Sequence, residues 1–242
     1  MLIYDYICWF FLYSVAGWLY ESILCSAIEK QWINRGFLSG PYCPIYGFGA
    51  LINILVLDES KNVLVLFYLG AVTACTLEYF TSWLMEKTFN ARWWDYSGHR
   101  FNLNGRISMA GAVVFGVFSV ILIRIIHPEV LAVTEKLSDQ EILISAWIIV
   151  GVFLLDSIVT VSQVVGFNKK LKLADIRLPV SEIKLQLSEI KSAVSKLNFS
   201  EIRILRAFPR FKSVKYNDAF QLVKEAYRNT IWRNRSKKRA TK

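Results

Sequence analysis

Metal-binding and nucleotide-binding signatures are scarce in this 242-residue chain. It has two histidines, His99 and His127, which are far apart in the sequence, and four cysteines without any Cys-x-x-Cys spacing. Neither a disulfide framework nor a structural zinc site is therefore indicated. No Gly-Lys-Ser/Thr follows a glycine-rich stretch, so a phosphate-binding loop of the Walker type is excluded. We predict no metal site and no cofactor, and we expect any ATP use to require a separate subunit.

The N-terminus also lacks the basic residues that open a signal peptide, and Asp5 stands there instead. Ser14-Val15-Ala16 resembles a small-residue cleavage site, but the apolar character continues beyond it as far as Ile28. A signal peptide ends at its cleavage site. We therefore expect this segment to stay in the protein as a membrane helix.

Long apolar runs are the main feature that is present: 54% of the residues are hydrophobic and the mean hydropathy is +0.36. The runs extend from Ile3 to Ile28, Pro44 to Leu57, Val63 to Met85, Ile107 to His127 and Ile142 to Phe167. A helix needs roughly 20 residues to cross a bilayer, and the run from Pro44 is shorter than that. It could be a short helix, a half-inserted segment, or a helix entered through an irregular turn. The fold class predicted is all-α, a polytopic membrane protein with about five transmembrane helices.

Charge divides the chain near residue 168. Residues 1–168 carry a net charge of −4 and residues 169–242 a net charge of +14, which together give the total of +10. This asymmetry predicts a transmembrane domain over 1–168 and a basic tail over 169–242. Basic residues are also more numerous in loop one (residues 29–43) and loop three (residues 86–106) than in the other loops. The positive-inside rule therefore predicts a multi-pass protein of the cell membrane, with an external N-terminus and a cytoplasmic tail. Five crossings satisfy this arrangement, which favours a real crossing by Pro44–Leu57.

The tail contains a heptad-like pattern of aliphatic residues and predicts an amphipathic helix near 181–198. This helix could self-associate, pack on a partner, or lie on anionic lipid. The basic segment 233–239 is typical of a tail attracted to anionic lipid at the inner membrane surface. We do not expect nucleic acid as a partner, because basic clusters beside a membrane usually bind the membrane.

Three carboxylates lie inside the apolar runs: Glu21, Glu78 and Asp156. Because a charge at the bilayer centre costs about 2.5–3.5 kcal/mol on insertion scales, these groups should face protein or water. Glu21 and Glu78 each precede the cytoplasmic end of their run by about seven residues, roughly 10 Å at helical rise. We expect one polar cluster at that level, with Asp156 as a secondary member. The candidate residues are Glu21, Arg35, Glu78, Arg92, Asp95, Asn102, Asn104 and Arg106.

Both loops allow two interpretations. Loop one and the start of the next run hold three glycines and two prolines within residues 34–47, typical of a tight turn at the membrane surface or of a loop lining a polar cavity. The aromatic residues of loop three suit a membrane interface, whereas its concentration of polar side chains suits a site. The buried carboxylates could be interhelical bonds, a ligand or ion site, or a proton relay. Small residues at four-residue spacing, such as Gly70-Ala74 and Ala112-Gly116, predict close helix packing around them.

Four ordered motifs make the chain resemble a known family. They are Gly17-Trp18-x-x-Glu21, residues 34–47 (Asn34-Arg35-Gly36-Phe37 to Gly47), Trp94-Asp95-Tyr96-Ser97, and Phe101-Asn102-x-Asn104-Gly105-Arg106. This set is similar to the bacterial membrane family labelled putative ABC-transporter type IV, or CmpB-like. The resemblance implies an integral membrane protein of a transport system, without an assigned substrate or catalytic residue.

Three functions follow as hypotheses. The first is a permease-like membrane component of a transport or export system, assisted by a separate ATP-hydrolysing subunit and by homo-oligomerisation. The second is a non-transport scaffold or regulator that binds a partner through its tail. A membrane-embedded lipid-modifying enzyme is the third, but no nucleophile–base set supports it, and we expect the chain not to be an enzyme.

Overall fold

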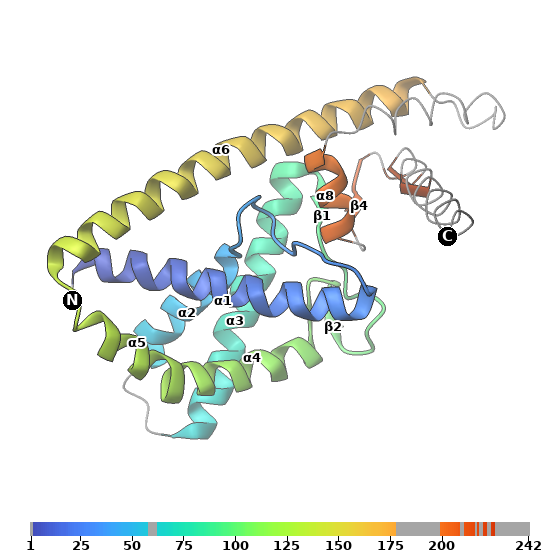
Figure 1. Cartoon of the computed structure of the whole chain (residues 1–242). Coiled ribbons are helices and arrows are strands. Elements are labelled where there is room, and N and C mark those ends of the chain that lie inside the picture. Colours follow the sequence, from blue (N-terminus) through green and yellow to red (C-terminus); the bar gives the residue numbers. More distant parts are fainter. Residues whose placement is uncertain are drawn as a thin grey trace, which may run out of the picture. The chain divides into compact units, whose positions relative to one another are not determined.

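The computed structural model describes residues 2–57, 62–177, 199–208, 211–215, 217, 220–221 and 224–225. Helices dominate these residues (Figure 1). The helical segments are α1 Ile3–Glu29, α2 Pro44–Leu57, α3 Val63–Phe89, α4 Met109–Ile121, the π-helix η1 Leu122–Ile126, α5 His127–Thr134, α6 Asp139–Arg177 and α8 Phe199–Ala207. The strands have two residues each: β1 Ala91–Arg92, β2 Asn102–Leu103, β3 Ile107–Ser108 and β4 Lys212–Ser213.

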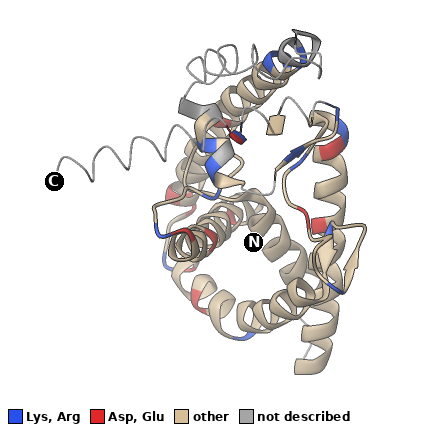
Figure 2. Ribbon diagram, turned by 90° about the vertical axis from the view of Figure 1, so that its right-hand side faces the viewer, with Lys and Arg blue, Asp and Glu red and all other residues tan. Residues whose placement is uncertain are grey.

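Four helical stretches are long and apolar enough to cross a membrane: Ile3–Glu29, Val63–Phe89, Met109–Thr134 and Asp139–Lys172. The fifth apolar helix, α2, has only 14 residues. Long parts of these helices carry neither Lys or Arg nor Asp or Glu (Figure 2). The predicted fold class is confirmed, because the chain is an all-α, multi-pass membrane protein.

Several boundaries differ from those expected. Residues 107–108 form strand β3 instead of the start of a helix, because they pair with β2 in a short antiparallel hairpin. The last long helix continues past residue 168 to Arg177. The π-helix η1 joins α4 to α5, so that helix extends to Thr134. The amphipathic helix predicted near 181–198 and the basic segment 233–239 lie outside the described residues.

The chain divides into two compact units. Unit 1 comprises residues 1–84 and 94–160, and unit 2 comprises residues 85–93 and 161–242. In unit 2 the aromatic rings of Trp93 lie 5.0 Å from both Phe208 and Phe211. Strand β1 pairs with β4 in the same unit. Part of the basic tail thus packs on the residues that follow α3.

In unit 1, α1 and α2 pack closely and in opposite directions. A Cβ atom placed on Gly17 would overlap Tyr46, and one on Gly47 would overlap Ser14. Farther along, Leu57 shares a buried apolar cluster with Trp9. Since Tyr46 opposes the second half of α1 and Leu57 the first, α2 returns along α1 toward its N-terminus.

A buried polar bridge joins the next helices. The amide of Asn53 in α2 donates to Ser119 Oγ of α4 at 2.7 Å, and Thr73 Oγ1 of α3 donates to Asn53 Oδ1 at 2.6 Å. Beside this bridge, Gly70 approaches Ser119 so closely that a Cβ atom there would overlap it. The small residues at four-residue spacing therefore do allow close approach of α3 and α4.

Candidate functional site

Loop one is held in an extended path along α1. Four residues of α1 at four-residue spacing, and hence on one face, bind it: Ser14, Trp18, Ser22 and Ser26. Ser26 accepts from the backbone N–H of Ile33 at 2.9 Å, and Ser22 accepts from that of Arg35 at 3.2 Å. The indole of Trp18 donates to Asn34 Oδ1 at 2.7 Å. Side chains of α1 thereby replace the backbone bonds that an irregular segment lacks.

The end of loop one lies beside the middle of α1. The backbone N–H of Cys43 donates to the carbonyl oxygen of Ser14 at 2.8 Å. Ser14 precedes the end of α1 at Glu29 by 15 residues, roughly 22 Å of helical rise. Loop one therefore returns along α1 instead of forming a tight turn at the helix end. This path explains why α2 has only 14 residues: it starts half-way along α1.

Asp156 of α6 binds the deepest part of loop one. Its carboxylate accepts from the backbone N–H groups of Ser39 and Gly40 at 3.1 and 2.8 Å, and from the hydroxyl of Tyr42 at 2.7 Å. Thr160 adds a fourth donor at 3.0 Å. Non-helical backbone at membrane depth is tolerated where protein satisfies its polar groups, and Asp156 supplies that satisfaction here.

Glu21 and Arg35 form an ion pair where loop one leaves α1. Arg35 Nε lies 3.5 Å from Glu21 Oε2, and the two side chains are 20% and 28% exposed. The hydroxyl of Tyr46, on the first turn of α2, donates to Glu21 Oε1 at 2.6 Å. One carboxylate thus connects α1, loop one and the start of α2.

Glu78 of α3 is more deeply buried, with 6% of its surface exposed. Its Oε1 accepts a hydrogen bond from the hydroxyl of Tyr96 in loop three at 3.0 Å. Its other oxygen, Oε2, is buried without a hydrogen-bond partner among the described residues. Burial of an ionised carboxylate that accepts only one hydrogen bond is costly in free energy, and Glu78 combines these two properties.

Three charged side chains affect the pKa of the Tyr96 hydroxyl. Burial raises the pKa of Tyr96, the negative charges of Glu78 and Glu21 raise it further, and Arg35 lowers it. The three charged side chains therefore act on the same phenol. Glu21, Arg35 and Glu78 thus lie near one phenol in unit 1, and their role as a single functional cluster stays a prediction.

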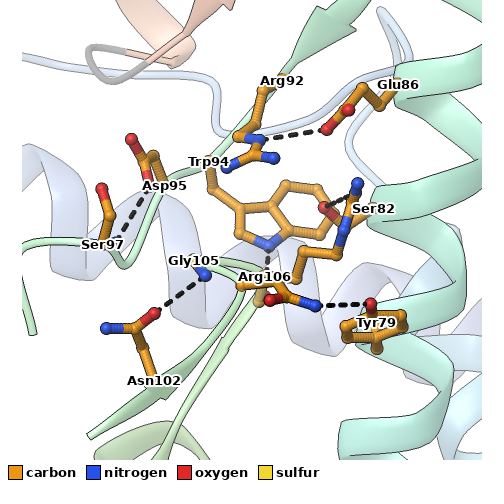
Figure 3. Close-up of polar contacts among 11 residues, drawn as sticks. Tyr79, Ser82, Glu86, Arg92, Trp94, Asp95, Ser97, Asn102, Gly105 and Arg106 are labelled. Atoms are coloured by element: carbon orange, nitrogen blue, oxygen red, sulfur yellow. Dashed lines mark hydrogen bonds and ion pairs between the residues drawn. The ribbon is translucent and has the colours of Figure 1, made fainter.

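Loop three holds the remaining candidates of unit 1 (Figure 3). Arg106 is buried, donates to Ser82 Oγ of α3 at 3.2 Å, and lies 5.5 Å above the ring of Tyr79. Its carbonyl oxygen accepts from the indole of Trp94 at 3.0 Å. Arg106 thus anchors the hairpin of loop three on α3.

In loop three, Asn102 and Asp95 form local turn contacts, and Asn104 contacts α3. Asn102 Oδ1 accepts from the backbone N–H of Gly105 at 2.8 Å, and Asp95 Oδ1 accepts from that of Ser97 at 2.9 Å. Asn104 donates to the hydroxyl of Tyr79 at 3.0 Å. Asn104 and Gly105 both have positive φ, and the Arg106 N–H donates to the carbonyl oxygen of Leu103, so Asn104 and Gly105 are the central residues of a β-turn within the three-residue connection from β2 to β3.

Arg92 forms an ion pair with a glutamate nearby in the sequence. It belongs to unit 2, where its Nε lies 3.0 Å from Glu86 Oε2. This ion pair is local, because it joins the end of α3 to strand β1. Arg92 therefore has a carboxylate partner of its own within six residues.

Sequence reasoning missed the phenols. Tyr46 and Tyr96 both lie within the family motifs, yet neither was selected as a cluster member. No local signal gave their roles, because Tyr96 reaches Glu78 across 18 residues and Tyr46 reaches Glu21 across 25. The hairpin did have a signal, since Asn-Gly at 104–105 is typical of a β-turn with positive φ.

A comparison with protein families supplies the assignment. The family described as putative ABC-transporter type IV matches residues 8–161, which include the ion pair, Glu78, Asp156 and both loops. The chain belongs to this family. No curated protein and no solved structure matches it. Membership of this family, together with the apolar helices, fits a membrane transport component.

Proposed function

We propose that this chain is a permease-like membrane component of a transport or export system, and that the polar cluster of unit 1 is its working site near the cytoplasmic side. The family supports a transport context. Buried carboxylates inside membrane helices support a functional site, because such groups are costly to place there.

The path of loop one is the observation that carries the proposal. An extended segment reaches the middle of α1, and a short helix starts from it. In secondary transporters, broken helices of this kind surround the substrate site, because unwound backbone and helix ends present polar groups inside the membrane. Here Tyr46, at the start of the short helix, contacts Glu21 of the cluster.

The proposal includes the surroundings of the protein. We infer a location in the cell membrane with the N-terminus outside and the tail in the cytoplasm, from the basic residues of the loops and tail. A separate ATP-hydrolysing subunit would supply energy, because the sequence has no Walker-type loop. A second copy of the chain would enlarge the pathway that one small helix bundle can provide.

A scaffold remains the second candidate, and Asp156 is the observation in its favour. Its four hydrogen bonds fasten loop one to α6, which is what a purely structural carboxylate would do. On this view Glu21 and Arg35 also serve only to hold loop one. The two candidates differ in whether loss of the Glu21–Arg35 ion pair should change activity or only the amount of protein in the membrane.

Two matched variants separate the candidates: Glu21→Gln breaks the ion pair with Arg35, and Glu86→Gln breaks the pair with Arg92. The tagged chain is purified from native membranes with its associated ATP-hydrolysing protein, and ATP hydrolysis is measured in reconstituted vesicles. Transport predicts that Glu21→Gln lowers hydrolysis at unchanged membrane abundance, whereas Glu86→Gln leaves it near the wild-type rate.

An effect on abundance alone would overturn the proposal. If no ATP-hydrolysing protein accompanies the chain, and both variants change only its membrane abundance, the ion pairs are structural. The scaffold interpretation would then replace transport.

A further inference from the structure

Glu78 combines burial with an incomplete set of hydrogen bonds. Only 6% of its surface is exposed, Tyr96 donates to Oε1, and the buried Oε2 has no partner within the described part of the chain. An ionised carboxylate has about four lone-pair sites to satisfy. A single phenol leaves most of that requirement unmet.

The charges around Glu78 are unbalanced as well. Three titratable groups face it: Glu21 from α1, Tyr96 from loop three, and Cys75 from one turn earlier in α3. None of them carries positive charge. Arg35 is within an ion-pair distance of Glu21, and within the described residues no cation forms an ion pair with Glu78. With both carboxylates ionised, the group of Glu21, Arg35 and Glu78 would carry an uncompensated negative charge.

We propose that Glu78 binds a proton at neutral pH, with the hydrogen on Oε2 and with Oε1 accepting from Tyr96. A neutral carboxyl group is far cheaper to bury than an anion, and like charges close together cannot both ionise readily. Protonation leaves Glu21 and Arg35 as a balanced pair. A metal cation would need several oxygen ligands, whereas a proton needs only the one oxygen that lacks a partner.

Glu78 also links α3 to loop three. Tyr96 belongs to loop three and Glu78 to α3, so a change in the protonation of Glu78 would change the hydrogen bond that joins them. As a step in a transport cycle this inference rests on the proposed function. The bound proton itself does not, because a scaffold with the same buried carboxyl would hold it too.

Infrared spectroscopy tests the proton directly, without any transport measurement. The purified full-length protein in lipid nanodiscs at neutral pH should show the C=O stretching band of a protonated carboxylic acid. We expect Glu78→Gln to abolish this band and Glu21→Gln to retain it. On raising the pH the wild-type band should disappear, while the carboxylate bands grow.

A second variant keeps the proposal testable if Glu78→Gln fails to fold. Tyr96→Phe removes the donor to Oε1, so the same band should shift to higher frequency, as expected for a C=O group that loses a hydrogen bond. Absence of the band in wild type, its persistence in Glu78→Gln, or an unchanged frequency in Tyr96→Phe would overturn the proposal. Loss of the band on adding Na⁺ at constant pH would overturn it in favour of a cation site.

Discussion

Asp156 shows how one side chain can determine the path of a loop. The sequence marks it as a polar residue in an apolar helix, and nothing local shows what it meets. In the structure it accepts hydrogen bonds from two backbone N–H groups of loop one, which are 117 and 116 residues away in sequence. Those N–H groups have no partner in a regular helix or strand, so the carboxylate satisfies them. Asp156 is therefore expected to be a stabilising residue of unit 1.

Replacing Asp156 with Asn should destabilise the protein by about 2 kcal/mol or more. The Asn side chain keeps the shape of Asp, but it lacks the negative charge that strengthens the hydrogen bonds from loop one. Its NH₂ group would also face N–H and O–H donors, with which it cannot form a hydrogen bond as an acceptor. Thermal unfolding in detergent measures the change. Tyr42→Phe removes one of the four bonds and should cost about 1 kcal/mol. Equal stability of Asp156→Asn and wild type would contradict the anchoring role.

Cys43 should be an unusually unreactive thiol. Burial raises its pKa to about 12, and its Sγ–H donates to the carbonyl oxygen of Arg35 at 3.1 Å. Because the thiolate is the reactive form, a pKa raised from 9.0 lowers the thiolate fraction at neutral pH by ~1,000-fold, and the fraction rises with pH. A protein whose only cysteine is Cys43 should react with a maleimide at least that much more slowly than one whose only cysteine is introduced by Gly98→Cys.

Position 98 is a suitable reference because it lies in a loop with no atoms near its Cβ position. Denaturation should equalise the two rates, which shows that the difference belongs to the folded state. Similar rates in the folded protein would mean that Cys43 is accessible and ionises normally.

At the scale of helices, small residues set how closely α3 and α4 approach. A Cβ atom on Gly70 would overlap Ser119, and one on Gly116 would overlap Phe67. Ser119 also accepts the hydrogen bond from the Asn53 amide, so the close contact of Gly70 with Ser119 and the polar bridge share one residue. Gly151 in α6 provides a contrast, because a Cβ atom there would meet nothing within 4 Å.

Gly70→Ala should therefore lower stability by about 1–3 kcal/mol, the usual cost of overpacking. Gly151→Ala should be neutral, or stabilising by up to about 1 kcal/mol, since Ala favours a helix over Gly. Both are compared by thermal unfolding and by the fraction of monodisperse protein. If the two substitutions behave alike, the close packing of α3 on α4 is not what limits stability.

At the scale of the whole chain, local patterns predicted the helices well and the path of loop one poorly. Apolar runs and their lengths are local properties, so the helices appear where the runs do. The position of loop one depends on partners in α1 and on Asp156 of α6, far away in sequence. Depth and direction predict that Glu21 and Glu78 lie at one level. Neither property shows that Tyr46 and Tyr96 donate to them, because those contacts depend on how the loops fold back.

Membrane topology is the remaining property of the whole molecule, and it can be tested at two exposed loop positions. In a cysteine-free background, Gly98→Cys places a thiol in loop three and Lys136→Cys places one between α5 and α6. The positive-inside rule puts basic loop three in the cytoplasm and the acidic loop around Lys136 outside. A membrane-impermeant maleimide should therefore label position 136 in intact cells, and position 98 only after permeabilisation. Labelling of position 98 from outside would reverse the orientation and place Glu21, Arg35 and Glu78 near the external surface instead.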